Sequence, residues 1–469
     1  MPRPRFNPYD WQTPAIAQQT QAMRQHGSAL NASDTGTGKT VMACATFRDL
    51  GVRPIIVAPP VTHPGWRRTL AAFGLNSGAV VSWEKLQRGI PGIVDLRYCT
   101  HVKYDIQVPN GQPWTRVVFM GYGAQSTLRA PGGLWRITPG KMLLTWTPDD
   151  GKEPAPKTPM VAILTTDGSL VPVAISDGKK DRRLTHNEWT LPDNAVVGAD
   201  EFHKAGADTS INSKMMVSCP RVLALSATVA NNPLRMKAIG TKLGLFAAPD
   251  YYAWCFNHGC KKGHFGGMEF VEDRREAVLR KLHSEIFPAR GCRVRWQDVP
   301  NFPGTTILPE IYERENLSSE DKRIIDRLAV LEAKAADDQA NDKPEITLLL
   351  REREYLETLK LPILVDLANA AIDNGKSVVI FTSFRHSLSW LKDQFSENCS
   401  LIFGEQNAAA REHSVRLFQT NATRICIAQV GAGGVGVDLH DITGKWPREA
   451  LICPTFSVVE LKQALGRVH

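Results

Sequence analysis

The chain has 469 residues, 43% hydrophobic and 22% charged, which is ordinary for a globular protein of two or three domains. No apolar run approaches the roughly 20 residues that span a bilayer, and none follows the basic start. We therefore expect a cytoplasmic protein without a membrane helix or signal peptide. A formal charge of +8 suits a polyanionic partner, and nine irregularly spaced cysteines are interpreted as reduced thiols.

The first motif is the glycine-rich segment 33–40, Ser-Asp-Thr-Gly-Thr-Gly-Lys-Thr, followed by apolar residues. Glycines let backbone N–H groups close around phosphate oxygens, and a helix that begins there adds its positive end. Lys39 is predicted to contact the β and γ phosphates of ATP, and the Thr40 hydroxyl to ligate Mg²⁺. A chance Gly-Lys-Thr in a surface turn is the weaker alternative. The predicted loop residues are Thr35, Gly36, Thr37, Gly38, Lys39 and Thr40.

Short apolar runs then alternate with helical segments, at 54–58, 79–82, 194–198 and 221–225. This rhythm predicts a parallel α/β sheet. The stretch 92–191 interrupts it, because it is rich in Gly, Pro, Thr and aromatic residues and lacks helical periodicity. We predict a β-rich insertion there. Its tryptophans could be exposed for DNA or protein contact, or could form a small core, the commoner case: Trp114, Trp135, Trp146 and Trp189.

A pair of acids stands directly after the buried run at 194–198, in Asp200-Glu201-Phe-His203. At a strand's carboxyl end, Asp200 could hold Mg²⁺ through water and Glu201 could polarise the attacking water as general base. Ser226 and Thr228 close the next strand, where their hydroxyls could relay the nucleotide state. A solvated helix start and an ordinary strand-end turn are the alternatives, which the order of the motifs disfavours.

Two further segments permit more than one interpretation. The segment 255–264 contains two Cys and two His, but the spacing is too tight and irregular for a usual zinc site, which we do not expect. The segment 290–296 mixes three arginines with Trp296, and we weigh contact with DNA evenly against plain packing.

The second half begins with helical periodicity at 318–340 and 346–372, and Ser318-Ser-Glu-Asp is typical of a helix start. Strand-like runs return at 377–381, 399–403, 424–428 and 450–453, which predicts a second, smaller α/β domain. The predicted divisions are 1–91 and 192–305 (first lobe), 92–191 (insertion), 306–375 (helical linker and start of the second lobe) and 376–469 (second lobe, expected to be incomplete).

Taken in order, the motifs resemble those of superfamily-two DEAD/DEAH-type helicases, and among them the Swi/Snf-like branch and phage-encoded DNA helicases. The resemblance runs from about Tyr9 to His469, apart from the insertion. It implies two RecA-like parallel-sheet lobes of α/β class, with ATP and Mg²⁺ in the cleft and nucleic acid across the top. A phage protein would work in the bacterial host cell.

The resemblance also implies roles for residues outside the motifs above. Gln12 would read adenine, and motif VI would supply Gln463 and the arginine Arg467, which reaches the γ-phosphate. A second such arginine would follow His469, so we expect the protein to continue beyond this residue. The residues implied for coupling or nucleotide contact are Pro59 and Pro60 (motif Ia), Trp83 (Ib), Thr382 and Ser383 (IV), and Gly433, Gly436 and Asp438 (V).

The expected function is movement on duplex DNA driven by ATP hydrolysis, in replication, fork remodelling or recombination. Paired asparagines after Thr228 resemble the Swi/Snf form of motif III and favour duplex DNA over single strands, with RNA less favoured. One alternative is a strand-separating helicase on single-stranded DNA or RNA. The other is a nucleotide-gated scaffold that clamps DNA with little turnover.

Overall fold

The computed structural model describes residues 7–76, 78–109, 113–138, 142–149, 157–176, 178–228, 232–263, 267–300, 308, 317–336, 343–433, 439–453, 461 and 464–468. They divide into two compact units, one formed by residues 84–193 with 209–220 and the other by the rest of the chain. Each unit is described by itself.

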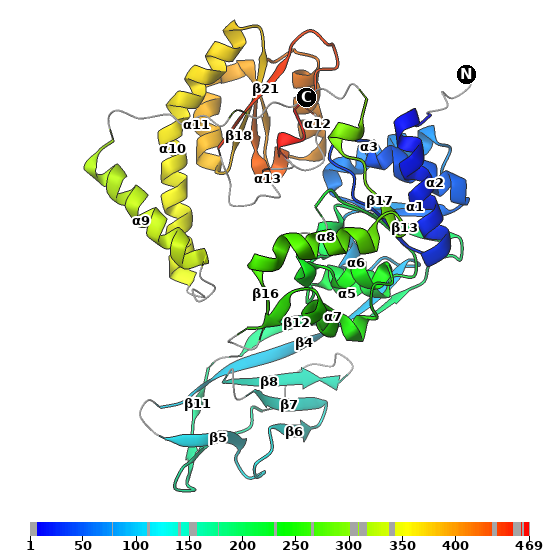
Figure 1. Ribbon diagram of the computed structural model, residues 1–469. Helices are drawn as coiled ribbons and strands as arrows, with labels where there is room; N and C mark the ends of the chain where they lie inside the picture. The colour runs from blue at the N-terminus through cyan, green and yellow to red at the C-terminus, as the bar shows by residue number, and fades with distance from the viewer. Residues whose placement is uncertain are drawn as a thin grey trace. The chain divides into compact units, whose positions relative to one another are not determined.

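The larger unit contains a six-stranded parallel sheet that carries most of the early motifs (Figure 1). The strand order is β17 (Gly291–Cys292), β1 (Ala29–Asn31), β14 (Val222–Leu225), β13 (Ala195–Asp200), β2 (Arg53–Val57), β3 (Ala79–Val81). Its runs read as continuous apolar segments because both faces are buried. The four predicted strands are confirmed, whereas β1 and β17 are too short to stand out in the sequence.

Helices lie between these strands along the chain. They are α1 (Thr13–His26), α2 (Lys39–Leu50), α3 (His63–Ala72), α6 (Lys237–Lys242), α7 (Tyr251–Asn257) and α8 (Arg275–Ile286). Of these, α1, α2 and α3 share a core cluster with the sheet. Phe47, Ile56 and Trp66 lie in one core cluster with Val196 and Leu225, so α2 and α3 share a core with β2, β13 and β14. This core holds the carboxyl ends of the strands in fixed positions.

The Cys/His-rich segment folds as the end of α7 and a hairpin of β15 (Cys260–Lys262) and β16 (Met268–Phe270). The two ring nitrogens of His258 lie 2.9 Å from the Trp254 carbonyl oxygen and 3.1 Å from Glu285 Oε1. His264 lies outside the described residues, and among those described no group of three His, Cys, Asp or Glu is placed to hold a metal ion. The histidine therefore packs as a structural residue.

The smaller unit is antiparallel and β-rich (Figure 1). One sheet has the order β11-β4-β8-β7-β6, with β12 on β4, and the other has β10-β9-β5. The strands are β4 (Val94–Gln107), β5 (Trp114–Phe119), β6 (Thr127–Ala130), β7 (Gly133–Thr138), β8 (Leu143–Pro148), β9 (Val161–Thr165), β10 (Leu170–Pro172), β11 (Ala174–Ile175) and β12 (Lys179–Trp189); α4 (Trp83–Leu86) precedes them, and α5 (Ile211–Ser218) belongs to this unit.

The tryptophans of this unit divide between core and surface. Trp135 and Trp146 are buried with ring centroids 5.0 Å apart, so the interpretation of these two as exposed contact residues is wrong and the core alternative holds. Trp189 is partly buried and its indole donates a hydrogen bond to the Met215 carbonyl oxygen. Trp114 is exposed.

A second parallel sheet lies in the C-terminal part of the larger unit, with the order β19-β20-β18-β21. Its strands are β18 (Ser377–Thr382), β19 (Cys399–Ile402), β20 (Ile425–Gln429) and β21 (Arg448–Ile452), and its helices are α11 (Arg385–Phe395), α12 (Ala408–Gln419) and α13 (Val430–Gly433). All four strands confirm predicted runs. The two sheets give the mixed α/β fold that the motifs predict.

Two long helices precede the second sheet, α9 (Ser319–Ala336) and α10 (Lys343–Asp373). Ser318 caps α9 as predicted, because its hydroxyl accepts a bond from Asp321 N while the Asp321 carboxylate accepts one from Ser318 N. Among the helices in the described part of the chain, none combines the length and apolar composition needed to cross a bilayer.

Candidate nucleotide-binding site

The phosphate-binding loop runs from the end of β1 to the start of α2. Gly36 and Gly38 adopt φ angles of 79° and 76°, a backbone conformation that other residues rarely take. At Gly38 a Cβ atom would also lie 2.4 Å from Gln12 Nε2. Ser33 N donates to Asn31 Oδ1 at 3.1 Å, and Val294 N donates to Ser33 Oγ at 3.0 Å. The loop is therefore held in shape by the protein's own bonds.

Lys39 closes this loop from the first turn of α2. Its ammonium donates to the carbonyl oxygens of Ser33 and Asp34, each at 3.0 Å. Burial lowers the pKa of Lys39, while the negative charges of Glu201 and Asp200 act in the opposite direction. A phosphate oxygen is a stronger acceptor than these carbonyl groups, so the ammonium is prepared to exchange them for an anion.

Gln12 lies behind the loop. Its Nε2 donates to Thr37 O at 3.1 Å, and its Oε1 accepts a bond from Tyr9 N at 3.0 Å. The side chain is buried and is not one of the residues that line the cavity described below. Tyr9 is exposed and stacks on Trp11 with centroids 5.9 Å apart. The structure thus gives Gln12 a contact with the loop, and the adenine contact stays a prediction.

The acid pair stands at the carboxyl end of β13, and two indoles hold it. Trp66 Nε1 donates to Asp200 Oδ2 at 3.0 Å, and Trp83 Nε1 donates to Asp200 O at 2.9 Å. Glu201 has φ 52° and ψ 50°, a left-handed conformation that is costly for a residue with a side chain. In this backbone conformation, Glu201 lines the same cavity as Lys39.

The two carboxyl groups differ in acidity because their surroundings differ. Burial and the adjacent charge of Glu201 raise the pKa of Asp200 to about 6. Burial acts to raise the pKa of Glu201 as well, but the hydrogen bond and charge of His203 and the charges of Lys39 and Arg467 outweigh it. The net pKa of Glu201 is lowered, so this carboxylate is ionised at neutral pH.

His203 connects the acid pair to the end of β14. Its Nδ1 lies 3.3 Å from Glu201 Oε2, 3.3 Å from Ser226 Oγ and 3.5 Å from Thr228 Oγ1. The side chains predicted from two separate motifs therefore meet at one ring nitrogen. A change in the position of Glu201 would be transmitted to the segment that follows β14.

A cavity of about 530 Å³ is lined by the loop, the acid pair, α3 and α12. Lys39, Thr40, Asp200, Glu201 and Arg467 are among its lining residues. Arg467 Nη2 lies 3.9 Å from Glu201 Oε1. The position of Arg467 beside Glu201 depends on the preceding glycine, Gly466, because a Cβ atom there would lie 1.9 Å from Thr35 Oγ1.

The remaining predicted residues lie at several places. Pro59 and Pro60 follow β2. Thr382 is the last residue of β18 and Ser383 follows it, where Ser383 N donates to Glu357 Oε2 at 3.0 Å. None of these four lines the cavity. Gly433 ends α13, and Gly436, Asp438 and Gln463 lie outside the described residues.

Several residues of the site were not predicted. Trp296 Nε1 donates to Thr35 O at 2.7 Å, so the segment 290–296 packs on the loop, and β17 pairs with β1. Arg411 and Arg416 of α12 line the cavity from the second sheet. A buried indole needs an acceptor, which is a usable signal for Trp66 and Trp296. The helix α12 is not preceded by any motif, and nothing in the sequence pointed to its arginines.

Replacement of Asp200 by Asn is expected to stabilise the metal-free protein by about 1–3 kcal/mol at pH 7.5. The pKa of Asp200 is raised from 3.8 to about 6, so its contribution to stability is complete below 3.8 and is lost as pH rises through 6. Asparagine carries no charge to bury. Thermal unfolding in EDTA between pH 4 and 7.5 checks this, and a gain that does not shrink toward pH 4 contradicts it.

Comparison with known proteins finds a helicase domain in the C-terminal part of the chain and a relative that aligns with most of it. Residues 359–469 match the helicase conserved C-terminal domain. The chain is 25% identical over 457 residues to the protein named "Putative ATP-dependent RNA helicase L364" of Acanthamoeba polyphaga mimivirus, covering 93% of this chain and 72% of that protein.

Two solved structures align with most of the chain at low similarity. The Sulfolobus solfataricus SWI2/SNF2 ATPase core in complex with dsDNA gives 11% identity and a TM-score of 0.38, over 96% of this chain and 88% of that one. S. cerevisiae Dbp5 bound to RNA and ADP BeF3 gives 10% and 0.42, over 98% and 80%. Similarity at this level does not bear on the substrate. The matched domain and the relative that spans nearly the whole chain support an ATP-hydrolysing helicase of superfamily two.

Proposed function

We propose that this helicase uses ATP hydrolysis to move along duplex DNA. The observation that carries the proposal is the meeting of Glu201, Ser226 and Thr228 at His203 Nδ1. It joins the cavity to the start of the segment after β14, so a change at the nucleotide can alter the position of that segment. A motor requires a connection of this kind.

The residues of the cavity fit a nucleoside triphosphate and a divalent cation. The loop offers glycine-rich backbone and the Lys39 ammonium, and the buried Thr35 Oγ1 makes no hydrogen bond in the described structure. Carboxylate and hydroxyl oxygens are the ligands that Mg²⁺ prefers, and Asp200 and Thr40 supply them. When bound, Mg²⁺ would neutralise charge on the phosphate oxygens.

Hydrolysis then depends on positioning and charge. Glu201, which is ionised at neutral pH, accepts a proton from the attacking water, and His203 fixes the direction of its carboxylate. Lys39 and Arg467 both line the cavity and stabilise the negative charge that spreads over the transferred phosphoryl group.

We propose duplex DNA as the track because the segment after β14 resembles the Swi/Snf form of motif III. Asn232 of that segment caps η6 (Pro233–Arg235), since its Oδ1 accepts a bond from Leu234 N at 2.8 Å. Strand separation on RNA is the second candidate, favoured by the name of the mimivirus relative. A role in replication, fork remodelling or recombination, and a phage origin, remain predictions.

The test is phosphate release without nucleic acid and with blunt duplex DNA, single-stranded DNA, duplex RNA and single-stranded RNA. Strong stimulation by blunt duplex DNA supports the proposal, and displacement of a triplex strand from that duplex would establish movement. Stimulation by RNA or single strands alone, with unwinding of a tailed duplex, would support the second candidate. Binding of DNA without any stimulation would leave only the scaffold.

Trp66→Phe is expected to raise the half-saturating Mg²⁺ concentration about tenfold, because a hydrogen bond to a charged group contributes about 1.5–3 kcal/mol. The substitution removes the donor to Asp200 Oδ2 and keeps most of the ring. Trp83→Phe is the matched control, since it removes a bond to the Asp200 backbone oxygen only. Equal effects of the two substitutions would contradict a specific role for Trp66.

A further inference from the structure

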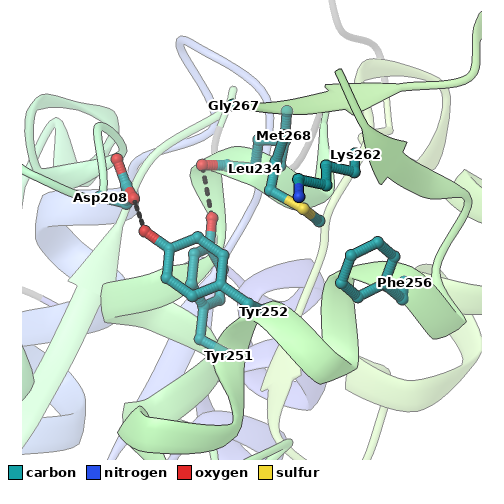
Figure 2. A pocket seen from close by; sticks show the side chains of 8 residues that line it. All are labelled: Asp208, Leu234, Tyr251, Tyr252, Phe256, Lys262, Gly267 and Met268. Carbon is teal, nitrogen blue, oxygen red and sulfur yellow. Dashed lines mark hydrogen bonds between the residues drawn. The ribbon is translucent and has the colours of Figure 1, made fainter. Parts of the chain in front are cut away.

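A second cavity, of about 500 Å³, lies in the larger unit beside α7 and the β15–β16 hairpin (Figure 2). The residues that matter here are Asp208, Leu234, Tyr252, Phe256, Lys262 and Met268, whose side chains surround a common space. The nucleotide-binding cavity shares none of these residues. What the second cavity binds is therefore a separate question from how ATP is bound.

The walls of this cavity are fixed to the segments that leave β13 and β14. Tyr252 donates its hydroxyl to Asp208 Oδ2 at 2.8 Å, and Tyr251 donates its hydroxyl to Leu234 O at 2.7 Å (Figure 2). Asp208 lies in the segment that begins with Glu201, and Leu234 lies in the segment that begins with Ser226. The two tyrosines therefore join α7 to both segments of the coupling cluster, by which we mean Glu201, His203, Ser226 and Thr228.

Two aromatic side chains of α7 face solvent across the cavity. Tyr252 is 45% exposed and Phe256 is 50% exposed, and their spacing of four residues puts them on one face of the helix. Large apolar groups gathered on a surface mark a binding site more often than single ones do. Rings in this position can stack on a flat partner, and every nucleobase has a flat π face.

Both signs of charge lie near these rings, with more lysines than carboxylates. The Lys237 ammonium lies 5.4 Å and 5.6 Å from the ring centroids of Tyr251 and Tyr252. Lys261 and Lys262 are both exposed on β15. The Asp208 carboxylate, which accepts the Tyr252 hydroxyl, is the acidic group among the residues that line the cavity. A flat ligand with negative charge fits this combination better than an apolar peptide side chain does.

We propose that this cavity binds an unpaired nucleotide of a DNA or RNA strand, with its base stacked on Phe256 or Tyr252 and its phosphate beside Lys262. The proposal rests on the proposed function, in which nucleic acid is the track. Since Tyr251 and Tyr252 are bonded to the segments that carry the coupling cluster, an occupied cavity can report the presence of an unpaired base to the nucleotide-binding site.

The test is equilibrium binding of labelled oligothymidylate, oligouridylate and an oligothymidylate of the same length with abasic sites. The double variant Tyr252→Ala with Phe256→Ala is expected to bind base-bearing oligonucleotides about tenfold more weakly and the abasic one as the wild type does. Lys262→Gln should weaken all of them and reduce the salt slope by about one. If the double variant loses affinity for oligothymidylate, the bound strand is DNA. If it loses affinity for oligouridylate, the bound strand is RNA.

Matched controls are Tyr252→Phe, which keeps the ring, and Tyr122→Ala, which removes an exposed ring of the other unit. Both should bind as the wild type does, and the circular dichroism spectrum of every variant should match that of the wild type. Equal affinity of the double variant and the wild type overturns the proposal, as does an equal loss on the abasic strand. If the wild type binds nucleic acid and is stimulated by it while the variants bind equally well, this cavity is not the binding site but the proposed function still holds.

Discussion

Glu201→Gln is expected to lower kcat for ATP hydrolysis by about 100- to 10,000-fold, the range that a general base contributes. The amide has nearly the same shape but cannot accept the proton of the attacking water. Because Glu201 is ionised at neutral pH, the wild type loses no activity to protonation of this group there. Single-turnover hydrolysis, with nucleotide affinity measured separately, checks that the loss lies in the chemical step.

The matched control for this substitution is His203→Gln, which keeps a polar side chain near Glu201 and removes the ring nitrogen that joins Glu201 to Ser226. It should leave basal hydrolysis within about tenfold of the wild type and reduce the stimulation by nucleic acid. If Glu201→Gln retains most of its turnover while nucleotide still binds, another group activates the water and the proposed role of Glu201 is wrong.

Much of the fold follows from short apolar runs between helical segments. The strands at 194–198 and 221–225 were predicted because parallel strands buried on both faces show as continuous hydrophobic residues. By contrast, β17 has two residues and pairs with β1 only through the tertiary fold, so no local pattern reveals it. The segment 290–296 was therefore weighed evenly between packing and DNA contact, and the structure shows that Trp296 packs on the phosphate loop.

The candidate site divides in the same way. Lys39, Asp200 and Glu201 stand in local motifs whose chemistry can be read from residue types at strand ends. The indole of Trp66 reaches Asp200 across 134 residues of sequence, and a contact of that kind follows from how α3 packs on the sheet. For Gln12, the motif alone does not predict the contact that the structure shows. Its side-chain amide donates a hydrogen bond to a backbone oxygen of the phosphate-binding loop, 25 residues further along the chain.

Arg467→Ala is expected to lower kcat by about 1,000- to 100,000-fold, as removal of an arginine that stabilises phosphoryl transfer does. In the structure its Nη2 lies 3.9 Å from Glu201 Oε1, a long contact for an ion pair, while both residues line the cavity. The charge on the transferred group grows only during the reaction, so ground-state affinity for ATP should change little. Steady-state kcat with affinity for a non-hydrolysable nucleotide separates the two.

A second arginine of the cavity provides the control that makes this prediction specific. Arg416 of α12 also lines the cavity, and its Nη2 lies 3.5 Å from His413 Nδ1. Its charge is similar in kind, but among the described residues neither Asp200 nor Glu201 contacts it, so Arg416→Ala should lower kcat less than tenfold. If both substitutions cost the same, positive charge anywhere in the cavity is sufficient. If Arg467→Lys retains part of the activity that Arg467→Ala loses, the positive charge at that position contributes to catalysis. The planar guanidinium group, which lysine lacks, then accounts for the rest of the activity.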